Sequence, residues 1–148
     1  MELHWEWKAF DELTAEEVYN ILCVRQQVFV LEQECLYLDA DGKDRKAFHL
    51  MGFLNNELVA YARILAPGVS YPEVSMGRIL TTQKARGTGS GMQLMEVGLS
   101  RISEEYGNVA IRISAQSYLK EFYRKYGFEP TGKEYLEDEI PHMEMLRK

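Results

Sequence analysis

The sequence contains few of the residues and patterns that mark specialised classes of protein. Its only two cysteines, Cys23 and Cys35, are too few for a disulfide framework and lack the spacing of a zinc site. Reduced thiols in a cytoplasmic protein are therefore expected. No apolar run approaches the ~18 residues that a membrane span needs, and the N-terminus lacks the basic and apolar segments of a secretion signal.

Positive charge is also scarce. The chain has 17 Lys and Arg against 23 Asp and Glu, which is a net charge of −6. Proteins that bind nucleic acids usually carry a basic excess or a basic stripe, so the balance disfavours that class. We expect no nucleic-acid partner and no membrane partner. Small molecules or amines remain open as partners.

The length and the order of predicted elements indicate one domain over residues 1–148. A chain of 148 residues with 46% hydrophobic residues can bury a core. Alternating apolar residues predict strands, and apolar residues every three or four positions predict helices. The predicted ranges are strands over 3–9, 47–54, 57–65, 73–81, 109–115 and 141–146, and helices over 15–31, 92–106 and 118–126. This order predicts an α/β (α+β) fold, with one mixed sheet and helices on both faces.

Four arginines fall among the apolar residues of these predicted elements: Arg25, Arg63, Arg78 and Arg112. Arg25 lies in the first helix, which begins at a capping box formed by Thr14 and Glu17. A buried cation must find a partner or line a polar pocket. The strand arginines could pair with Glu32 or Glu73, or could hold an acidic acceptor, and structural pairing is the simpler interpretation.

An acidic stretch, Asp39 to Asp44, resembles part of a calcium-binding loop. Such a loop needs Gly at its sixth position and Glu at its twelfth, and the sequence has Asp44 and Leu50 there. We therefore expect a solvated acidic loop and no metal site.

The most informative segment is Arg86-Gly87-Thr88-Gly89-Ser90-Gly91, between a predicted strand and a predicted helix. A helix start has unpaired N–H groups and the positive end of the helix dipole, so it can bind a phosphate. The spacing fits neither the dinucleotide-binding fingerprint nor the P-loop. A tight turn without a ligand is the alternative.

A second segment, Gln116 to Phe128, lies one predicted strand downstream and contains Phe122-Tyr123 and Gly127-Phe128. Together the two segments resemble the GNAT superfamily of acetyl-CoA-dependent N-acetyltransferases, and more closely its ElaA-like subfamily. Further matches are Arg25, Val28-Phe29-Val30, Glu32-Gln33, His49, Gly77-Arg78, Gln93-Leu94-Met95 and Ile140-Pro141-His142. Leu36 and Glu139 depart from that pattern, which usually has Pro and Gly at these positions. Both departures weaken any inference about the acceptor that is drawn from the subfamily.

The resemblance implies a mostly antiparallel sheet of six or seven strands and acetyl-CoA as co-substrate, with no metal. It implies transfer of an acetyl group to a primary amine by direct attack in a ternary complex. The alternative is a non-catalytic acyl-CoA-binding sensor or scaffold. The residues implied for the coenzyme are Ile79, Leu80, Thr81, Arg86, Gly87, Thr88, Gly89, Ser90, Gly91, Met92, Gln116 and Tyr123.

For the chemistry, the resemblance assigns Tyr123 as proton donor to the leaving thiolate, although a core aromatic would have the same spacing. Candidates for the base are His142 and Glu32, and candidates for acceptor binding are Gln33, His49 and Arg78. The identity of the acceptor stays open among small molecules and peptides. The use of a longer acyl donor and the formation of a homodimer also stay open.

Overall fold

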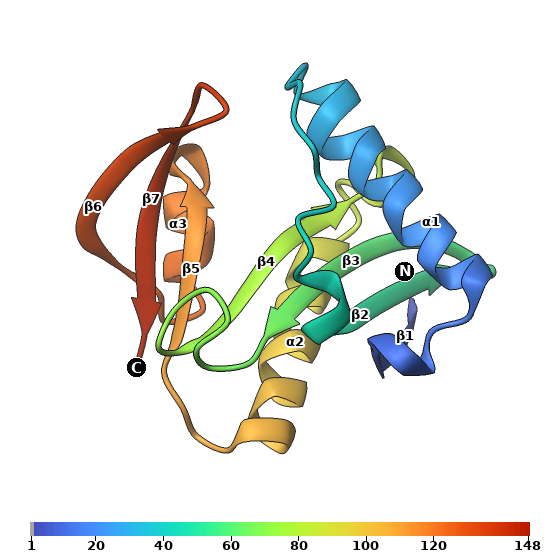
Figure 1. Ribbon diagram of the computed structural model, residues 1–148, viewed down its shortest axis with the longest axis horizontal. Coiled ribbons are helices and arrows are strands. Elements are labelled where there is room, and N and C mark those ends of the chain that lie inside the picture. Colours follow the sequence, from blue (N-terminus) through green and yellow to red (C-terminus); the bar gives the residue numbers. More distant parts are fainter. Residues whose placement is uncertain (1) are drawn as a thin grey trace.

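The computed structural model describes residues 2–148 and contains one seven-stranded sheet (Figure 1). The strands are β1 (His4–Ala9), β2 (Ala47–Leu54), β3 (Glu57–Leu65), β4 (Val74–Thr81), β5 (Ile111–Gln116), β6 (Glu129–Glu137) and β7 (Ile140–Arg147). They lie in the order β1-β2-β3-β4-β5-β7-β6. Every neighbouring pair is antiparallel except β4 and β5. The predicted mixed, mostly antiparallel sheet is confirmed.

Three α-helices and five short helical segments connect the strands. They are η1 (Phe10–Glu12), α1 (Ala15–Arg25), η2 (Gln26–Glu32), η3 (Asp44–Lys46), η4 (Gln83–Ala85), α2 (Ser90–Tyr106), η5 (Ser117–Leu119) and α3 (Lys120–Arg124). The predicted capping box is present: Glu17 N donates to Thr14 Oγ1 at 3.1 Å, and Thr14 N donates to Glu17 Oε1 at 2.9 Å. The helical stretch then continues as the π-helical η2, and π-helical turns are frequent at functional sites.

Helices cover both faces of the sheet, as predicted. In Figure 1, α2 and α3 lie behind the sheet and α1 lies in front of it. The larger core includes Leu50, Ile64, Met76, Leu94, Tyr123 and Phe128. A smaller core under α1 includes Ile21, Val28, Met51, Tyr61 and Leu80. Because adjacent strand residues point to opposite faces, Leu50 and Met51 enter different cores.

The sheet divides between its two parallel strands. β4 pairs with β5 only at Val74 with Ile111 and at Ser75 with Arg112, so the strands diverge beyond these two pairs. On its other side, β4 contains a bulge, because its register with β3 shifts near Arg78, whose φ is +48°. A bulge bends its strand and redirects the groups on it. Divergence and bulge together open the sheet where the predicted coenzyme-binding residues lie.

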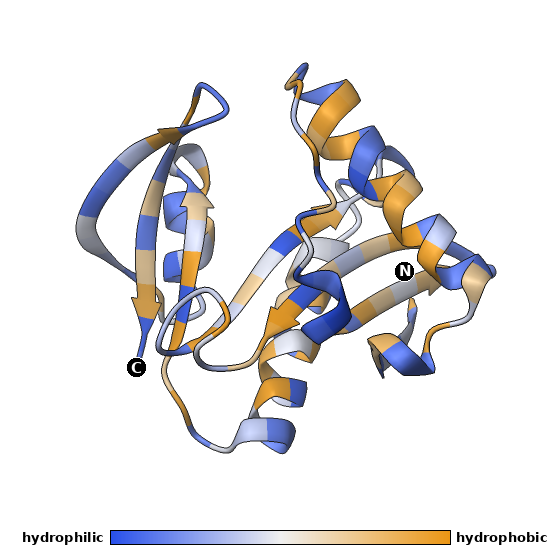
Figure 2. Cartoon of the chain, in the orientation of Figure 1, coloured by the Kyte–Doolittle hydropathy of each residue, from blue (hydrophilic) through white to orange (hydrophobic). Residues whose placement is uncertain are grey.

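Three expectations are wrong in detail. Residues 129–137 form the edge strand β6, which was not predicted, because an almost fully exposed strand shows no apolar alternation. The predicted helix over 118–126 is a 3-10 turn followed by the short α3. The acidic loop is only partly solvated: Asp39 is buried and Asp44 is half-buried, whereas residues 40–42 are exposed. Figure 2 shows the strongly hydrophilic η3 at the end of this loop.

Candidate active site

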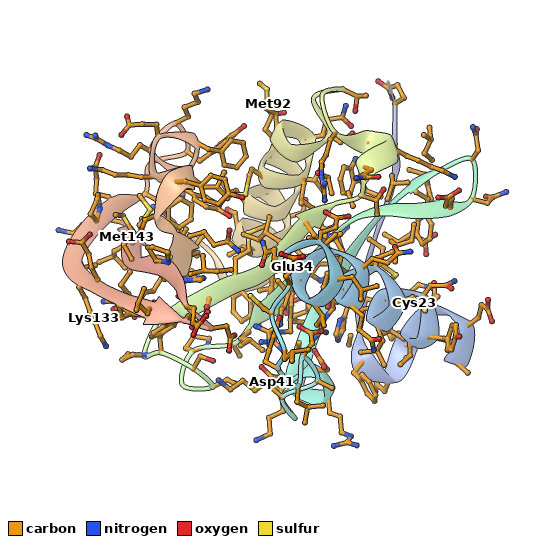
Figure 3. The ribbon with its side chains drawn as sticks, turned by 90° about the horizontal axis from the view of Figure 1, so that it is seen from above. Cys23, Glu34, Asp41, Met92, Lys133 and Met143 are labelled. Atoms are coloured by element: carbon orange, nitrogen blue, oxygen red, sulfur yellow. The ribbon has the colours of Figure 1, made fainter. Side chains whose placement is uncertain are left out.

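A cleft of about 920 Å³ opens where β4 and β5 diverge. Its walls come from the end of η2, the loop that follows it, the start of α2, the helix α3 and the β6–β7 hairpin. Figure 3 labels Met92 at the start of α2 and Asp41 in the loop before η3, and they lie on opposite sides of β4. Gly91, next to Met92, and Asp41 both line the cleft, so the cleft extends to both sides of β4.

The glycine-rich segment forms the junction between β4 and α2, as its composition predicts. Gly87 and Gly89 have φ of +77° and +84°, which L-amino acids with side chains rarely adopt. A Cβ at either position would meet no atom within 4 Å, so the space beside the backbone is open. The first intrahelical bond is from Gln93 N to Gly89 O at 3.1 Å, so the preceding amides have no partner within the helix. These amides can donate to a bound anion.

Two predicted site residues form an ion pair with each other. Arg86 Nη2 lies 2.6 Å from Glu32 Oε1, and Arg86 Nε donates to Thr81 O at 3.1 Å. Both side chains line the cleft. Glu32 is thus engaged by a cation and is not a free carboxylate facing an acceptor.

Tyr123 projects from α3 into the inner wall of the cleft and is only 5% exposed. Its ring packs against Phe122 and Phe128 in edge-on contacts. Burial raises the pKa of its phenol well above the usual value, with a smaller contribution from Tyr118. The hydroxyl forms no hydrogen bond with any residue of 2–148, so it is a protonated donor that faces the cleft without a partner.

His142, on β7, is almost fully buried at the opposite wall. Its Nδ1 lies 2.7 Å from Ile140 O, and because a carbonyl only accepts, Nδ1 carries a proton. Its Nε2 lies 3.4 Å from Glu137 Oε2, and its ring stacks on Tyr135. Glu137 was not predicted as a site residue, because β6, which carries it, has no strand-like pattern in the sequence.

The remaining predicted residues separate into two groups. Gln33, Arg78, Gln116, Gly91 and residues 79–81 line the cleft, whereas residues 87–90 and Met92 lie beside it, outside its lining. His49 does not line it, because its Nε2 donates to Asp44 O at 2.9 Å and its Nδ1 lies 2.7 Å from the hydroxyl of Tyr61. Burial lowers the pKa of His49, which keeps its ring neutral. The structure therefore places it beneath the site as a packing residue.

The buried arginines pair with the acidic loop. Arg25 is 0% exposed and contacts Asp39 at 2.6 Å and Asp44 at 2.7 Å. Arg63 binds Asp41 and Asp44, while Arg78 binds Asp39 and Asp41. These arginines hold the pKa values of Asp41 and Asp44 below the usual range against the opposing effect of burial.

The expected pairing of the strand arginines is thus corrected for two of the three. Arg112 binds Glu73, as the sequence suggested, and also Glu144. Arg63 and Arg78 instead pair with aspartates of the loop, while Glu32 pairs with Arg86. Structural pairing is confirmed as the general interpretation.

Residues 2–148 include no group of three or more His, Cys, Asp or Glu side chains arranged to hold a metal ion. No helix in this part of the chain is long and apolar enough to cross a membrane.

Comparison with known proteins identifies the family. Residues 11–148 match the model of the acetyltransferase (GNAT) domain. The chain is 44% identical over 147 residues to UPF0039 protein sll0451 of Synechocystis, covering 99% of this chain and 96% of that protein. It is 37% identical over 148 residues to Protein ElaA of Escherichia coli, covering 99% and 97%. The crystal structure of an acyl-CoA N-acyltransferase from Pseudomonas aeruginosa superposes with a TM-score of 0.95 at 39% identity, covering 99% and 100%. The chain belongs to the GNAT acetyltransferases and is an ElaA-like acyltransferase.

Proposed function

We propose that the chain is an acetyl-CoA-dependent N-acetyltransferase that acetylates a primary amine by direct attack in a ternary complex. One observation carries the proposal: the start of α2, at Arg86 and Gly91, the diverging strands and a buried phenol without a partner among residues 2–148 border the same cleft. The family supports the use of an acyl-CoA donor. Acetyl-CoA supplies an acyl group activated as a thioester when it is bound.

The residues around the glycine-rich segment fit a diphosphate. The open space at Gly87 and Gly89 admits it close to the backbone, where the amides that begin α2 can donate to its oxygens. Arg86 can exchange Glu32 for a phosphate oxygen, since a guanidinium binds both groups through the same donors. The hydroxyls of Thr88 and Ser90 bond to each other at 2.7 Å and support the turn.

The diverging part of β4 provides amides for the pantetheine arm and for the carbonyl oxygen of the acyl group. Beyond Ser75 the edge of β4 that faces β5 has no paired strand. Thr82 N donates to Val59 O on β3, so by alternation Leu80 N points to the same side and the N–H groups of Ile79 and Thr81 point to the open edge. Donors fixed in position before the reaction stabilise negative charge that develops on a carbonyl oxygen. We assign Gln116, at the facing end of β5, to the same arm.

The acceptor must lose a proton before it attacks. An amine with a pKa near 10.4 costs about 4–5 kcal/mol to deprotonate at pH 7. His142 is placed for this step, because its Nδ1 proton is held by Ile140 O and its Nε2 is the nitrogen that can accept. Glu137, beside Nε2, stabilises the imidazolium that results.

Tyr123 completes the transfer by donating its phenolic proton toward the sulfur as the C–S bond breaks. Its raised pKa keeps that proton in place until negative charge develops nearby. In this assignment Glu32 acts on the coenzyme side, through Arg86, and Gln33 and Arg78 face the acceptor.

Free-thiol release from acetyl-CoA, measured with a panel of amines, tests the proposal. We expect Tyr123→Phe to lower kcat about 100-fold or more while the Kd of acetyl-CoA is unchanged. Tyr126→Phe is the matched control, since it removes a hydroxyl from the turn that follows α3, outside the cleft.

Two results would contradict the proposal. Binding of acetyl-CoA without amine-dependent thiol release would favour the non-catalytic binding module. Full activity of Tyr123→Phe would remove the phenol from the mechanism. The same panel with longer acyl-CoA donors measures the acyl preference.

A further inference from the structure

One side chain of the edge strand β6 turns inward. Eight of the nine residues of β6 are exposed, and Tyr135 is the exception. It lies opposite His142 of β7 in the register of the two strands, and opposed residues share one face of a sheet. His142 lines the cleft and Tyr135 does not. Any effect of Tyr135 on the cleft is therefore exerted through the residues that it contacts.

The ring of Tyr135 packs on the imidazole of His142. Their centroids are 6.2 Å apart and their planes differ by 16°, so the two rings are nearly parallel. Aromatic pairs at this separation attract each other in addition to the effect of burial. No other aromatic ring among residues 2–148 is paired with His142. The stack therefore favours one plane of the imidazole.

The other contacts of His142 leave that plane weakly restrained. The χ2 torsion of histidine has a broad distribution, so the surroundings must select its value. Nδ1 makes one hydrogen bond, with Ile140 O at 2.7 Å. Nε2 lies 3.4 Å from Oε2 of the half-exposed Glu137, which is an ion-pair contact and not a hydrogen bond with a set direction. Tyr135 is thus the contact that decides the plane of the ring.

Tyr135 is itself fixed at both ends. β7 lies between β6 and β5 in the sheet, and the side chain of Tyr135 crosses β7 to reach β5. There its hydroxyl shares a hydrogen bond with Ser114 Oγ. Tyr71, in the loop before β4, also interacts with it: burial raises the pKa of the Tyr71 phenol to about 12, with contributions from Tyr135 and Glu144. A side chain held by its backbone in one strand and by its hydroxyl on another presents its ring in one position.

We propose that Tyr135 is a positioning residue that holds the imidazole of His142 in the plane required for proton transfer from the acceptor. In that plane Nδ1 stays on Ile140 O, and Nε2 is left to accept the proton. The inference rests on the proposed function and adds to it a residue outside the cleft. A base displaced by about 1 Å can lose about 100-fold in rate, so the loss of the stack should be visible in kcat.

Variants of Tyr135 separate the stack from the hydroxyl bond. We expect Tyr135→Leu, which removes the ring, to lower kcat about 10-fold or more and to leave the KM for the amine within about 3-fold. Tyr135→Phe keeps the ring and should stay within about 3-fold of the wild-type kcat. Tyr135→Val is a second variant without the ring, for use if leucine is not accommodated, since valine favours strands. Leu136→Ala is the matched control, because Leu136 is the next residue on β6, exposed and outside the cleft.

NMR of the imidazole nitrogens measures the ring of His142 without turnover. The chain has three histidines, and the signal of His142 is assigned as the one lost in His142→Gln. At about pH 8.5, where an ordinary imidazole is neutral, we expect the Nδ1-protonated tautomer of His142 in the wild type and in Tyr135→Phe. Tyr135→Leu should give a mixture of tautomers, because a ring that rotates away from Ile140 O loses the bond that selects Nδ1. The signals of His49 should stay unchanged.

The two measurements distinguish failure of the inference from failure of the proposed function. A tautomer mixture in Tyr135→Leu without a fall in kcat supports the inference and contradicts the role of His142 as base. An unchanged tautomer in both variants without the ring overturns the inference, whatever the activity. An equal loss of kcat in Tyr135→Phe and Tyr135→Leu would overturn it as well, since the hydroxyl and not the stack would then be responsible.

Discussion

At the scale of single residues, the pair formed by Glu32 and Arg86 changes how both are interpreted. The sequence assigns them separate tasks, one on the acceptor side and one on the coenzyme side. In the structure they are 2.6 Å apart, and Arg86 also binds a backbone carbonyl. In the proposed complex, the Glu32 carboxylate would compete with the diphosphate for the guanidinium of Arg86. The identities of these residues are visible in the sequence, but their contact across 54 positions is not.

The variant Glu32→Gln therefore distinguishes two roles for Glu32: a base that deprotonates the acceptor, or a carboxylate that competes with the diphosphate for Arg86. We expect this variant to bind CoA about 1.4–5-fold more tightly, because a partly exposed ion pair contributes about 0.2–1 kcal/mol. We expect kcat to change less than 10-fold. Isothermal titration with CoA and steady-state kinetics measure the two effects, and Glu34→Gln, two positions away, is the control. A fall in kcat of about 100-fold with unchanged affinity would instead identify Glu32 as the base.

At the scale of elements, the junction of β4 with α2 is the best predicted part of the site. Its glycines stand out in the sequence, and the structure places two of them in conformations that require glycine. The edge strand β6 is the opposite case: its residues Glu129–Glu137 face solvent, so no apolar face marks the strand. Elements that bury one face can be predicted from a sequence, because burial of that face requires apolar residues at a regular spacing.

Helix α2 has a glycine at each end, and the two can be compared to test the junction. Gly89 and Gly107 have φ of +84° and +83°, and a Cβ at either meets only open space. Alanine should lower the free energy of unfolding by about 1–2 kcal/mol at Gly89, whose ψ is +6°, and by more at Gly107, whose ψ of −161° lies in a region that essentially only glycine adopts. We expect only Gly89→Ala to raise the Kd of CoA, by about 10-fold or more, because it alone lies beside the free amides. Equal affinity of both variants would exclude the junction as the diphosphate site.

At the scale of the whole molecule, buried polar contacts join the loop before β2 to the sheet. Arg25 and His49 are both nearly inaccessible, and both contact residues of that loop. Removing one partner of such a buried pair is strongly destabilising, since the other charge is left uncompensated. The network thus holds this loop, whose residues Tyr37, Asp41 and Lys43 line the cleft, against the sheet.

His49 makes the stability of the molecule depend on pH. Burial lowers its pKa in the folded state, whereas in the unfolded chain it titrates near 6.5. As pH falls below that value, the unfolded state takes up a proton that the folded state does not, so the free energy of unfolding decreases. We expect a loss of about 1–2 kcal/mol between pH 7 and pH 5, measured by thermal denaturation.

Two histidine variants are compared by how steeply their free energy of unfolding changes with pH. His49→Gln should be less stable at every pH and should lose much of the slope between pH 7 and pH 5. His4→Gln should retain it, because His4 is exposed on the first strand. An unchanged slope in His49→Gln would show that another group causes the dependence.

The sequence by itself determined the family, the mixed sheet and the glycine-rich helix start, because each depends on local periodicity or on residues close together in the chain. Tyr123 also stands out within a local motif. Only the tertiary structure decided which charges meet: Glu32 with Arg86, Glu137 with His142, and the acidic loop with three arginines. These pairs depend on strand divergence and loop packing, and the chain contains no local pattern that specifies contacts between distant residues.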